Sequence, residues 1–266
     1  GDQLGCRSRA TAHTFIVKNC SRSTFHTISL LGGPGFGFFE DGGGGSSNRY
    51  LNCSILRPPT PAGAVHAPAL STAADGLHSS EAKRGPIIEG CVFENMGDDA
   101  IAIHGTYNLV VAAPDRTTLV VAAFGSWGAS PVAVGERLWL YDTLLRPAAE
   151  VEVVGVARMP DAYSPPGNPE SKTLPKRYKQ AGPFLSLRLS DALPAKLPVG
   201  FDWLMANQNR TGAGFSVHNN TIHNNHARAI NLKASSGQVT NNVFSGSFHG
   251  GIIVAPELYW GEADYS

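Results

Sequence analysis

The sequence predicts an all-β protein: a right-handed parallel β-helix interrupted by a small antiparallel β-barrel. Three observations lead to this fold class. A repeat with a period in the low twenties lies near the C-terminus, the same short-strand pattern recurs in the N-terminal part, and the pattern changes in between. The chain has 266 residues, enough for a substantial core, and its 30 glycines and 18 prolines indicate many turns.

The repeat is clearest around two pairs of asparagines. Asn219-Asn220 and Asn241-Asn242 lie 22 residues apart (241 − 219), and each pair precedes a short strand pattern, a turn and a second strand, "AINL" or "GIIV". Such a period is typical of a β-solenoid, in which asparagines at one turn position stack as a hydrogen-bonded ladder. A β-sandwich with coincidental asparagine pairs would not predict the matching flanks. Parallel crossovers favour the right-handed form.

The same pattern extends over two parts of the chain. "GPIIEGCVFENMGDDAIAIHG" has the form of "GQVTNNVFSGSFHGGIIVAP", so residues 1–105 and 213–266 are predicted to form one β-helix. Between them, 106–212 contains longer strand patterns such as "LVVAAPDRTTLVVAAF", which predict an inserted β-barrel-like domain. The chain begins without methionine or signal peptide, and we expect it to be truncated at both ends.

Composition restricts the partners. Lys+Arg and Asp+Glu balance at 21 each, which gives no electrostatic argument for nucleic acid, and no apolar run approaches the roughly 20 residues of a membrane span. Cys20, Cys53 and Cys91 occur in similar settings, "KNCS", "LNCS" and "EGCV", and are predicted to form a buried column of reduced thiols.

Three aspartates are the candidate catalytic residues. Asp75 and Asp98 are 23 residues apart (98 − 75), about one turn of the solenoid, which places Asp75 beside Asp98 and Asp99 at the roughly 4.8 Å strand spacing. Clustered carboxylates repel one another, so their pKa values separate into the acid and base that glycosidic cleavage requires. Turn-capping aspartates and a calcium site are the competing interpretations, and acid–base catalysis is favoured over both.

"ADGLHS" and "GDDAIAIHG" resemble motifs of the pectin-lyase-like β-helix glycosidases. The resemblance is closest to glycoside hydrolase family 110, the α-1,3-galactosidases, and more distant to the family 28 polygalacturonases. It implies an inverting α-galactosidase-like hydrolase in which Asp98 is the general acid, while Asp75 and Asp99 hold and activate the attacking water. Inversion implies carboxyl groups roughly 6.5 to 9.5 Å apart. The family usually has a polar residue at the position of Ala102.

A second set of residues is expected to bind substrate. Arg228 follows the insertion and is suited to bind sugar hydroxyls or to orient an aspartate, and His78 and His104 flank the three aspartates. The remaining candidates are Glu40, expected to reach the same face, and Trp260 and Glu262, which match a Trp-x-Glu pattern of the family. No cofactor and no metal is expected.

The expected partner is an oligosaccharide or polysaccharide, and the expected location is secreted or extracytoplasmic. A polygalacturonase-like enzyme or a calcium-dependent polysaccharide lyase is one alternative; the former requires cations for uronate, for which Arg228 and Lys233 are the nearby candidates. A non-catalytic carbohydrate-binding β-helix is the other.

Overall fold

The computed structural model describes residues 12–41, 43, 45–122, 132–142, 144–164, 183–195, 203–258 and 261–263. These ranges contain strands and no helix, which confirms the all-β prediction at that level. It follows that no helix of the described chain is long and apolar enough to cross a membrane. The chain divides into two compact units: unit 1 is Gly1–His104, Gly212–Ala255 and Asp264–Ser266, and unit 2 is Gly105–Thr211 and Pro256–Ala263.

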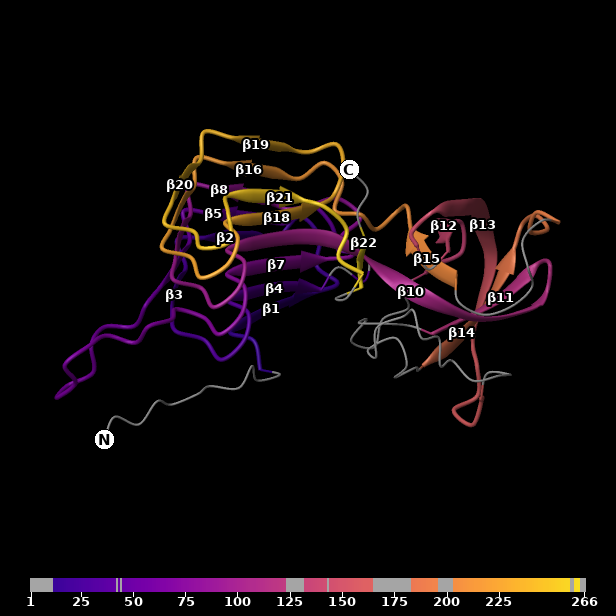
Figure 1. The fold of residues 1–266 in the computed structure, drawn as a ribbon, viewed down its shortest axis with the longest axis horizontal. Coiled ribbons are helices and arrows are strands. Elements are labelled where there is room, and N and C mark those ends of the chain that lie inside the picture. The colour runs from indigo at the N-terminus through magenta and orange to yellow at the C-terminus, as the bar shows by residue number, and fades with distance from the viewer. Residues whose placement is uncertain are drawn as a thin grey trace. The chain divides into compact units, whose positions relative to one another are not determined.

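Unit 1 is built from three parallel sheets. Sheet I pairs its strands in the order β1, β4, β7, β10, β18, β21 (Figure 1). Their bounds are β1 Phe15–Lys18, β4 Phe38–Asp41, β7 Leu77–Ser80, β10 Ile101–Asp115, β18 Ile230–Lys233 and β21 Ile252–Val254. Strand β10 continues beyond sheet I into unit 2.

Sheets II and III have five strands each among the described residues. Sheet II contains β2 Thr24–His26, β5 Arg49–Leu51, β8 Ile87–Glu89, β16 Ser216–His218 and β19 Gln238–Thr240. Sheet III contains β3 Ser29–Leu31, β6 Ser54–Leu56, β9 Val92–Glu94, β17 Thr221–His223 and β20 Val243–Ser245.

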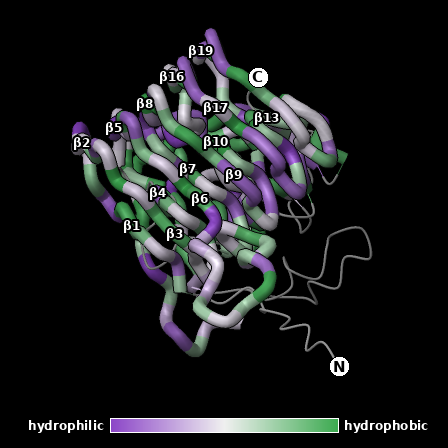
Figure 2. The backbone as a smooth tube through the Cα atoms, turned by 90° about the vertical axis from the view of Figure 1, so that its left-hand side faces the viewer, coloured by the Kyte–Doolittle hydropathy of each residue, from purple (hydrophilic) through white to green (hydrophobic). Residues whose placement is uncertain are grey.

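The chain visits these sheets in strict rotation, I then II then III, and one such circuit is called a coil here. Figure 2 shows successive coils of unit 1 lying side by side. The rotation stops after β10 in sheet I and resumes with β16 in sheet II, so unit 2 occupies one sheet-to-sheet connection without skipping a strand. A stack of coils therefore brings residues on either side of the insertion together.

The core of unit 1 consists of one side of each short strand. In sheet I, Phe38, Leu77, Ile101 and Ile230 are in register and buried in the same apolar cluster. Side chains alternate across a strand, so the next residue of each strand points outward. The outward positions of sheet I carry the candidate site.

An asparagine ladder lies in the turns from sheet II to sheet III, as the repeat predicted. The Asn220 side-chain amide donates to Oδ1 of Asn242 at 2.9 Å, and the Cys91 backbone amide donates to Oδ1 of Asn220 at 2.8 Å. The preceding residues, Asn219 and Asn241, have φ angles of 59° and 54°. Asparagine tolerates this left-handed conformation, which explains the Asn-Asn pairs.

The predicted cysteine column is only partly correct. Cys53 and Cys91 continue the ladder, with the Cys53 backbone amide donating to the Cys91 sulfur at 3.3 Å. Cys20 instead follows β1, in the turn from sheet I to sheet II, so it belongs to a different stack. All three are free thiols.

Unit 2 contains a closed ring of antiparallel pairs: β10–β11, β11–β14, β14–β13, β13–β12, β12–β15 and β15–β10. The added strands are β11 Thr118–Ala122, β12 Arg137–Tyr141, β13 Pro147–Arg158, β14 Phe184–Leu189 and β15 Trp203–Asn207, and β22 Glu262–Ala263 pairs with β10. The unit limits, 105 and 211, lie one residue before the predicted ones, but residues 256–263 belong to unit 2 rather than to the second β-helix segment.

Candidate active site

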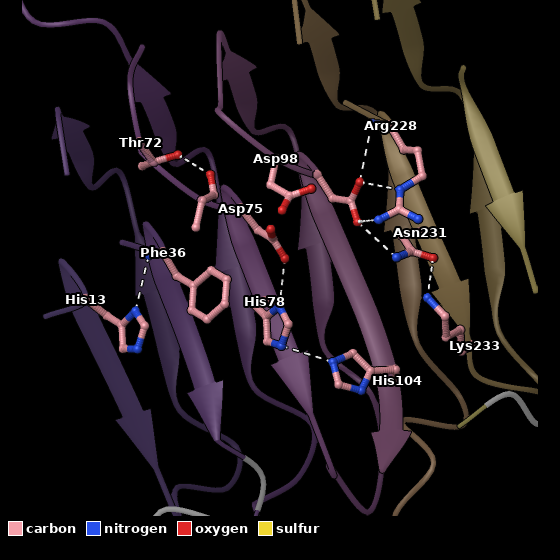
Figure 3. Close-up of polar contacts among 12 residues, drawn as sticks. His13, Phe36, Thr72, Asp75, His78, Asp98, His104, Arg228, Asn231 and Lys233 are labelled. Atoms are coloured by element: carbon pink, nitrogen blue, oxygen red, sulfur yellow. Dashed lines mark hydrogen bonds and ion pairs between the residues drawn. The ribbon is translucent and has the colours of Figure 1, made fainter. Parts of the chain in front are cut away.

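Asp75, Asp98 and Asp99 lie together at the start of two neighbouring strands of sheet I. Leu77 of β7 is in register with Ile101 of β10, so Asp75 is level with Asp99, and Asp98 is one position earlier. The sequence spacing placed Asp75 beside both Asp98 and Asp99, and the register shows that Asp99 is the one level with it. Each of the three places a carboxylate oxygen within 4.8 Å of the other two. Figure 3 shows Asp75 and Asp98 facing one another.

Glycines beside the aspartates allow the coils to approach this closely. A Cβ on Gly76 would lie 2.6 Å from the Ala100 carbonyl oxygen of the next coil, and a Cβ on Gly97 would lie 2.9 Å from the Ala73 carbonyl oxygen. Both neighbours are backbone, which has no room to move. The glycines of the two acidic motifs therefore permit the close approach of backbone that brings the aspartates together.

Burial differs among the three carboxylates. The exposed fractions of Asp75 and Asp99 are 5% and 2%, whereas Asp98 is partly exposed. Burial, and after it the charge of Asp75, raises the pKa of Asp99 to about 6, although Arg228 opposes the shift. Of the three carboxyl groups, Asp98 is therefore the one that solvent reaches, and the other two are buried.

Arg228, on the coil after β10, binds both carboxylate oxygens of Asp99. Its Nε donates to Oδ1 at 2.6 Å and its Nη2 to Oδ2 at 2.8 Å. Asn231 of β18 donates to Oδ2 at 2.9 Å, and Lys233 in turn donates to Oδ1 of Asn231 at 2.5 Å. Of the two roles predicted for Arg228, the structure places it in contact with the aspartate.

His78 and His104 form a chain of hydrogen bonds that ends on Asp75. Nδ1 of His78 lies 2.6 Å from Oδ2 of Asp75, and Nε2 of His78 lies 2.9 Å from Nε2 of His104 (Figure 3). If Asp75 is ionised, His78 donates from Nδ1 and accepts from His104. If Asp75 is protonated, both bonds reverse, so one proton on Asp75 determines the direction of the whole chain.

An aromatic ring holds His78 in place. Phe36 stacks on it with ring centroids 4.3 Å apart and an interplanar angle of 18°, and Phe39 packs beside it. His13 stacks on the other side of Phe36 at 4.7 Å. Since Phe36 is level with Asp75 in the neighbouring coil, this aromatic stack continues the row of site residues toward β1.

Glu40, another of the predicted residues, is not in this cluster. Glu40 was expected to reach the same face, but it is in register with Ser79, on the inward side of β4, where Asn48 donates to it at 2.8 Å. Strand alternation is the reason: Phe39 takes the outward position beside His78. Glu262 lies on β22 in unit 2, where it is in register with Thr106 of β10. Trp260 lies outside the described residues.

The structure adds residues that sequence reasoning did not place in the site. Asn231 is in register with Ala102, the position where a polar residue was expected, so the neighbouring coil supplies a polar side chain beside it. Asp41, 4% exposed, lies at an outward position of β4 level with Ser80, and its pKa is raised, mainly by burial. The outward positions lie one and three residues after the core residue of each strand, so counting one on from Ile230 and three on from Phe38 would have identified both.

The carboxylate separation differs from the expected one. Oxygens within 4.8 Å of one another are closer than the roughly 6.5 to 9.5 Å typical of inverting glycosidases. One water that donates two hydrogen bonds of about 2.8 Å spans such a gap, and so does a divalent cation with hard oxygen ligands. The three aspartates could therefore hold either an attacking water or a metal ion.

Comparison with known proteins adds no assignment: no family model matches the chain, and no curated protein matches it.

Proposed function

We propose that this chain is a secreted inverting glycoside hydrolase, resembling family 110, that cleaves an α-galactoside-type linkage. In this proposal the three parallel sheets of unit 1 form a right-handed, pectin-lyase-like parallel β-helix, and unit 2 is its inserted β-barrel. One observation carries the proposal: a partly exposed carboxyl group, Asp98, lies directly beside two buried ones, Asp75 and Asp99, whose oxygens are within water-bridging distance.

In this proposal the exposed and the buried carboxylates have different tasks. Asp98 meets the glycosidic oxygen and donates the proton that the departing alcohol needs. Asp75 and Asp99 accept the two hydrogens of one water and direct its lone pair at the anomeric carbon. The water's proton passes to this pair, for which the raised pKa of Asp99 is suitable, since a general base works best with a pKa near the operating pH.

The groups around the buried pair complete the proposed mechanism. Arg228 keeps Asp99 ionised against its burial and fixes its orientation. His78 and His104 offer a path by which a proton on Asp75 is exchanged for the next turnover. Both arrangements are made by the chain's own side chains, which is the preorganisation that electrostatic catalysis requires.

A calcium-dependent lyase is the second candidate, because three carboxylates at this distance suit a hard cation. A polygalacturonase-like activity has less support. Lys233, one of its two candidate uronate ligands, has an exposed fraction of 0% and donates to Asn231, while Arg228 is bound to Asp99. Neither cation is presented to an acidic sugar.

The experiment is galactose release from α-1,3-galactobiose, with oligogalacturonides as the alternative substrate, for the wild-type chain beside Asp98→Asn. Asparagine keeps the size of the side chain but cannot donate a carboxyl proton, so the rate should fall about 10²- to 10⁴-fold. Proton NMR of the first-formed anomer then tests inversion, and first-formed α-galactose would exclude it. An ultraviolet-absorbing product from oligogalacturonides would indicate a lyase. No product from any substrate would favour a binding protein.

A further inference from the structure

A pocket of about 440 Å³ lies on unit 1, beside the last described coil. It is lined by residues of two consecutive turns from sheet III to sheet I: Asn224, Asn225, His226, Gly246, Phe248 and His249. The volume is within the range of roughly 300 to 1,000 Å³ that small-molecule sites occupy. Nothing in the mechanism above uses it.

The strand register places this pocket next to the aspartates. Glu94, His223 and Ser245 are level at the ends of β9, β17 and β20, and Ile101, Ile230 and Ile252 are level seven residues later. The three turns therefore have equal length. Counted along them, His249 is level with Asp98 two coils away, a separation of about 10 Å at the roughly 4.8 Å strand spacing.

Asn225 ties the pocket to the proposed general acid. It is 1% exposed, and its side-chain amide donates to the carbonyl oxygens of Asp98 and Arg228, both at 2.7 Å. The backbone that carries Asp98 is thereby fixed to a residue of the pocket wall. A ligand in the pocket would lie against the wall that holds this backbone.

The lining suits a neutral sugar. Phe248 is 80% exposed and its ring lies 5.1 Å from that of His249, which gives an apolar surface for the C–H face of a pyranose. Asn224 and His226 are exposed and can hydrogen-bond hydroxyl groups. Because the described lining of the pocket includes no Lys or Arg, it offers no permanent positive charge to a uronate.

We infer that this pocket is a saccharide subsite, which holds the sugar on the leaving-group side of the bond cleaved at Asp98, with Phe248 as its stacking residue. The inference rests on the proposed function. The leaving-group side is assigned because Asp98 meets the oxygen of that sugar and Asn225 joins Asp98 to the pocket.

The test compares Phe248→Ala with Leu31→Ala, an exposed apolar residue (54%) on β3, at the first coil. Galactose release is measured from α-1,3-galactobiose, whose second sugar reaches the pocket, and from methyl α-galactoside, whose methyl group does not. Phe248→Ala should lower kcat/KM for the disaccharide about tenfold, the size of one aromatic contact, and leave the methyl galactoside unchanged. Leu31→Ala should change neither.

Equal effects of Phe248→Ala on both substrates, or none on either, would overturn the subsite while galactose release upholds the proposed function. If the wild-type chain releases no galactose, the hydrolase proposal fails, and the pocket is tested by saturation-transfer NMR with α-1,3-galactobiose. Transfer that the wild type gives and Phe248→Ala loses would keep the pocket as a sugar site. Equal transfer, or none, would remove it.

Discussion

Arg228 and Asp99, 129 residues apart in the sequence, are joined by two parallel contacts of 2.6 and 2.8 Å in the middle of the candidate site. A guanidinium in this arrangement stabilises the ionised carboxylate, and it opposes the burial that raises the pKa of Asp99 to about 6. The pair therefore sets the pH above which Asp99 is ionised.

Arg228→Ala should raise the pKa of Asp99 further, by roughly 1 to 3 units, because a positive charge next to the carboxylate is lost. The acidic limb of kcat/KM should move to higher pH by the same amount, since Asp99 must be ionised to accept a hydrogen from water. Carbon-13 NMR titration of the aspartate carboxyl groups measures the shift without relying on turnover. An unchanged Asp99 midpoint would contradict the assigned role, and Arg57→Ala, at an exposed pair with Glu94, is the control.

His104→Leu should reduce kcat about 10-fold or more, because His78 loses its partner at Nε2 and the proton path from Asp75 is broken. His104→Gln keeps an N–H donor for His78, so it should retain more activity than the leucine variant. Both substitutions remove the same ring. If the two variants behave alike in rate and in pH profile, the hydrogen bond has no part in the reaction.

Glu40→Gln should make stability less dependent on pH. Burial raises the folded-state pKa of Glu40 from 4.5 to about 7, so the folded chain binds more protons than the unfolded one between these values. The stability that this group contributes is complete below pH 4.5 and is lost as the pH rises through 7. Glutamine does not ionise, so the loss between pH 5 and pH 8 should shrink by on the order of 3 kcal/mol or less.

Denaturant titrations at the two pH values measure this difference, with the exposed Glu152→Gln as the control. A stability loss equal to that of the wild type would show that Glu40 is already ionised at pH 5.

Asn220→Ala should destabilise unit 1 by roughly 1 to 3 kcal/mol, the cost of leaving a buried backbone partner unsatisfied. Its side chain accepts from the Cys91 amide and donates to the Ile88 carbonyl, and it is 1% exposed. Thermal or denaturant unfolding gives the value. Thr221→Ala, an exposed neighbour on β17, should cost much less, and an equal cost would mean that the ladder adds nothing of its own.

Chelation should leave activity unchanged if the aspartates hold a water. Galactose release is measured after dialysis against EDTA and again after addition of calcium. Loss on chelation with recovery in calcium would show that the aspartates hold a metal ion that the hydrolysis requires, rather than a water alone. Calcium titration of the wild-type chain beside Asp75→Asn by calorimetry reports binding directly, independently of any substrate.

The repeat period was enough to predict parallel strands, the asparagine ladder and the proximity of the three aspartates. It could not give the register to one residue, so it placed Asp75 beside both Asp98 and Asp99 without deciding which of them is level with it. Glu40 was expected on the outer face from its place in the sequence alone, whereas the alternation of side chains along β4 puts it inside. Asn231 was missed because its importance depends on being level with Ala102, across the insertion.

The place of the insertion has a consequence during synthesis. The ribosome completes Asp99 and the sheet I part of β10, residues 101–104, and then adds residues 105–211 before Arg228 and β18 appear. At a translation rate of roughly 5 to 20 residues per second, the edge of β10 that pairs with β18 stays unpaired for on the order of 5 to 20 s. Throughout that interval the buried carboxylate lacks its guanidinium and the strand edge is free to pair with another nascent chain. Chaperone dependence should therefore concentrate at this stage of translation.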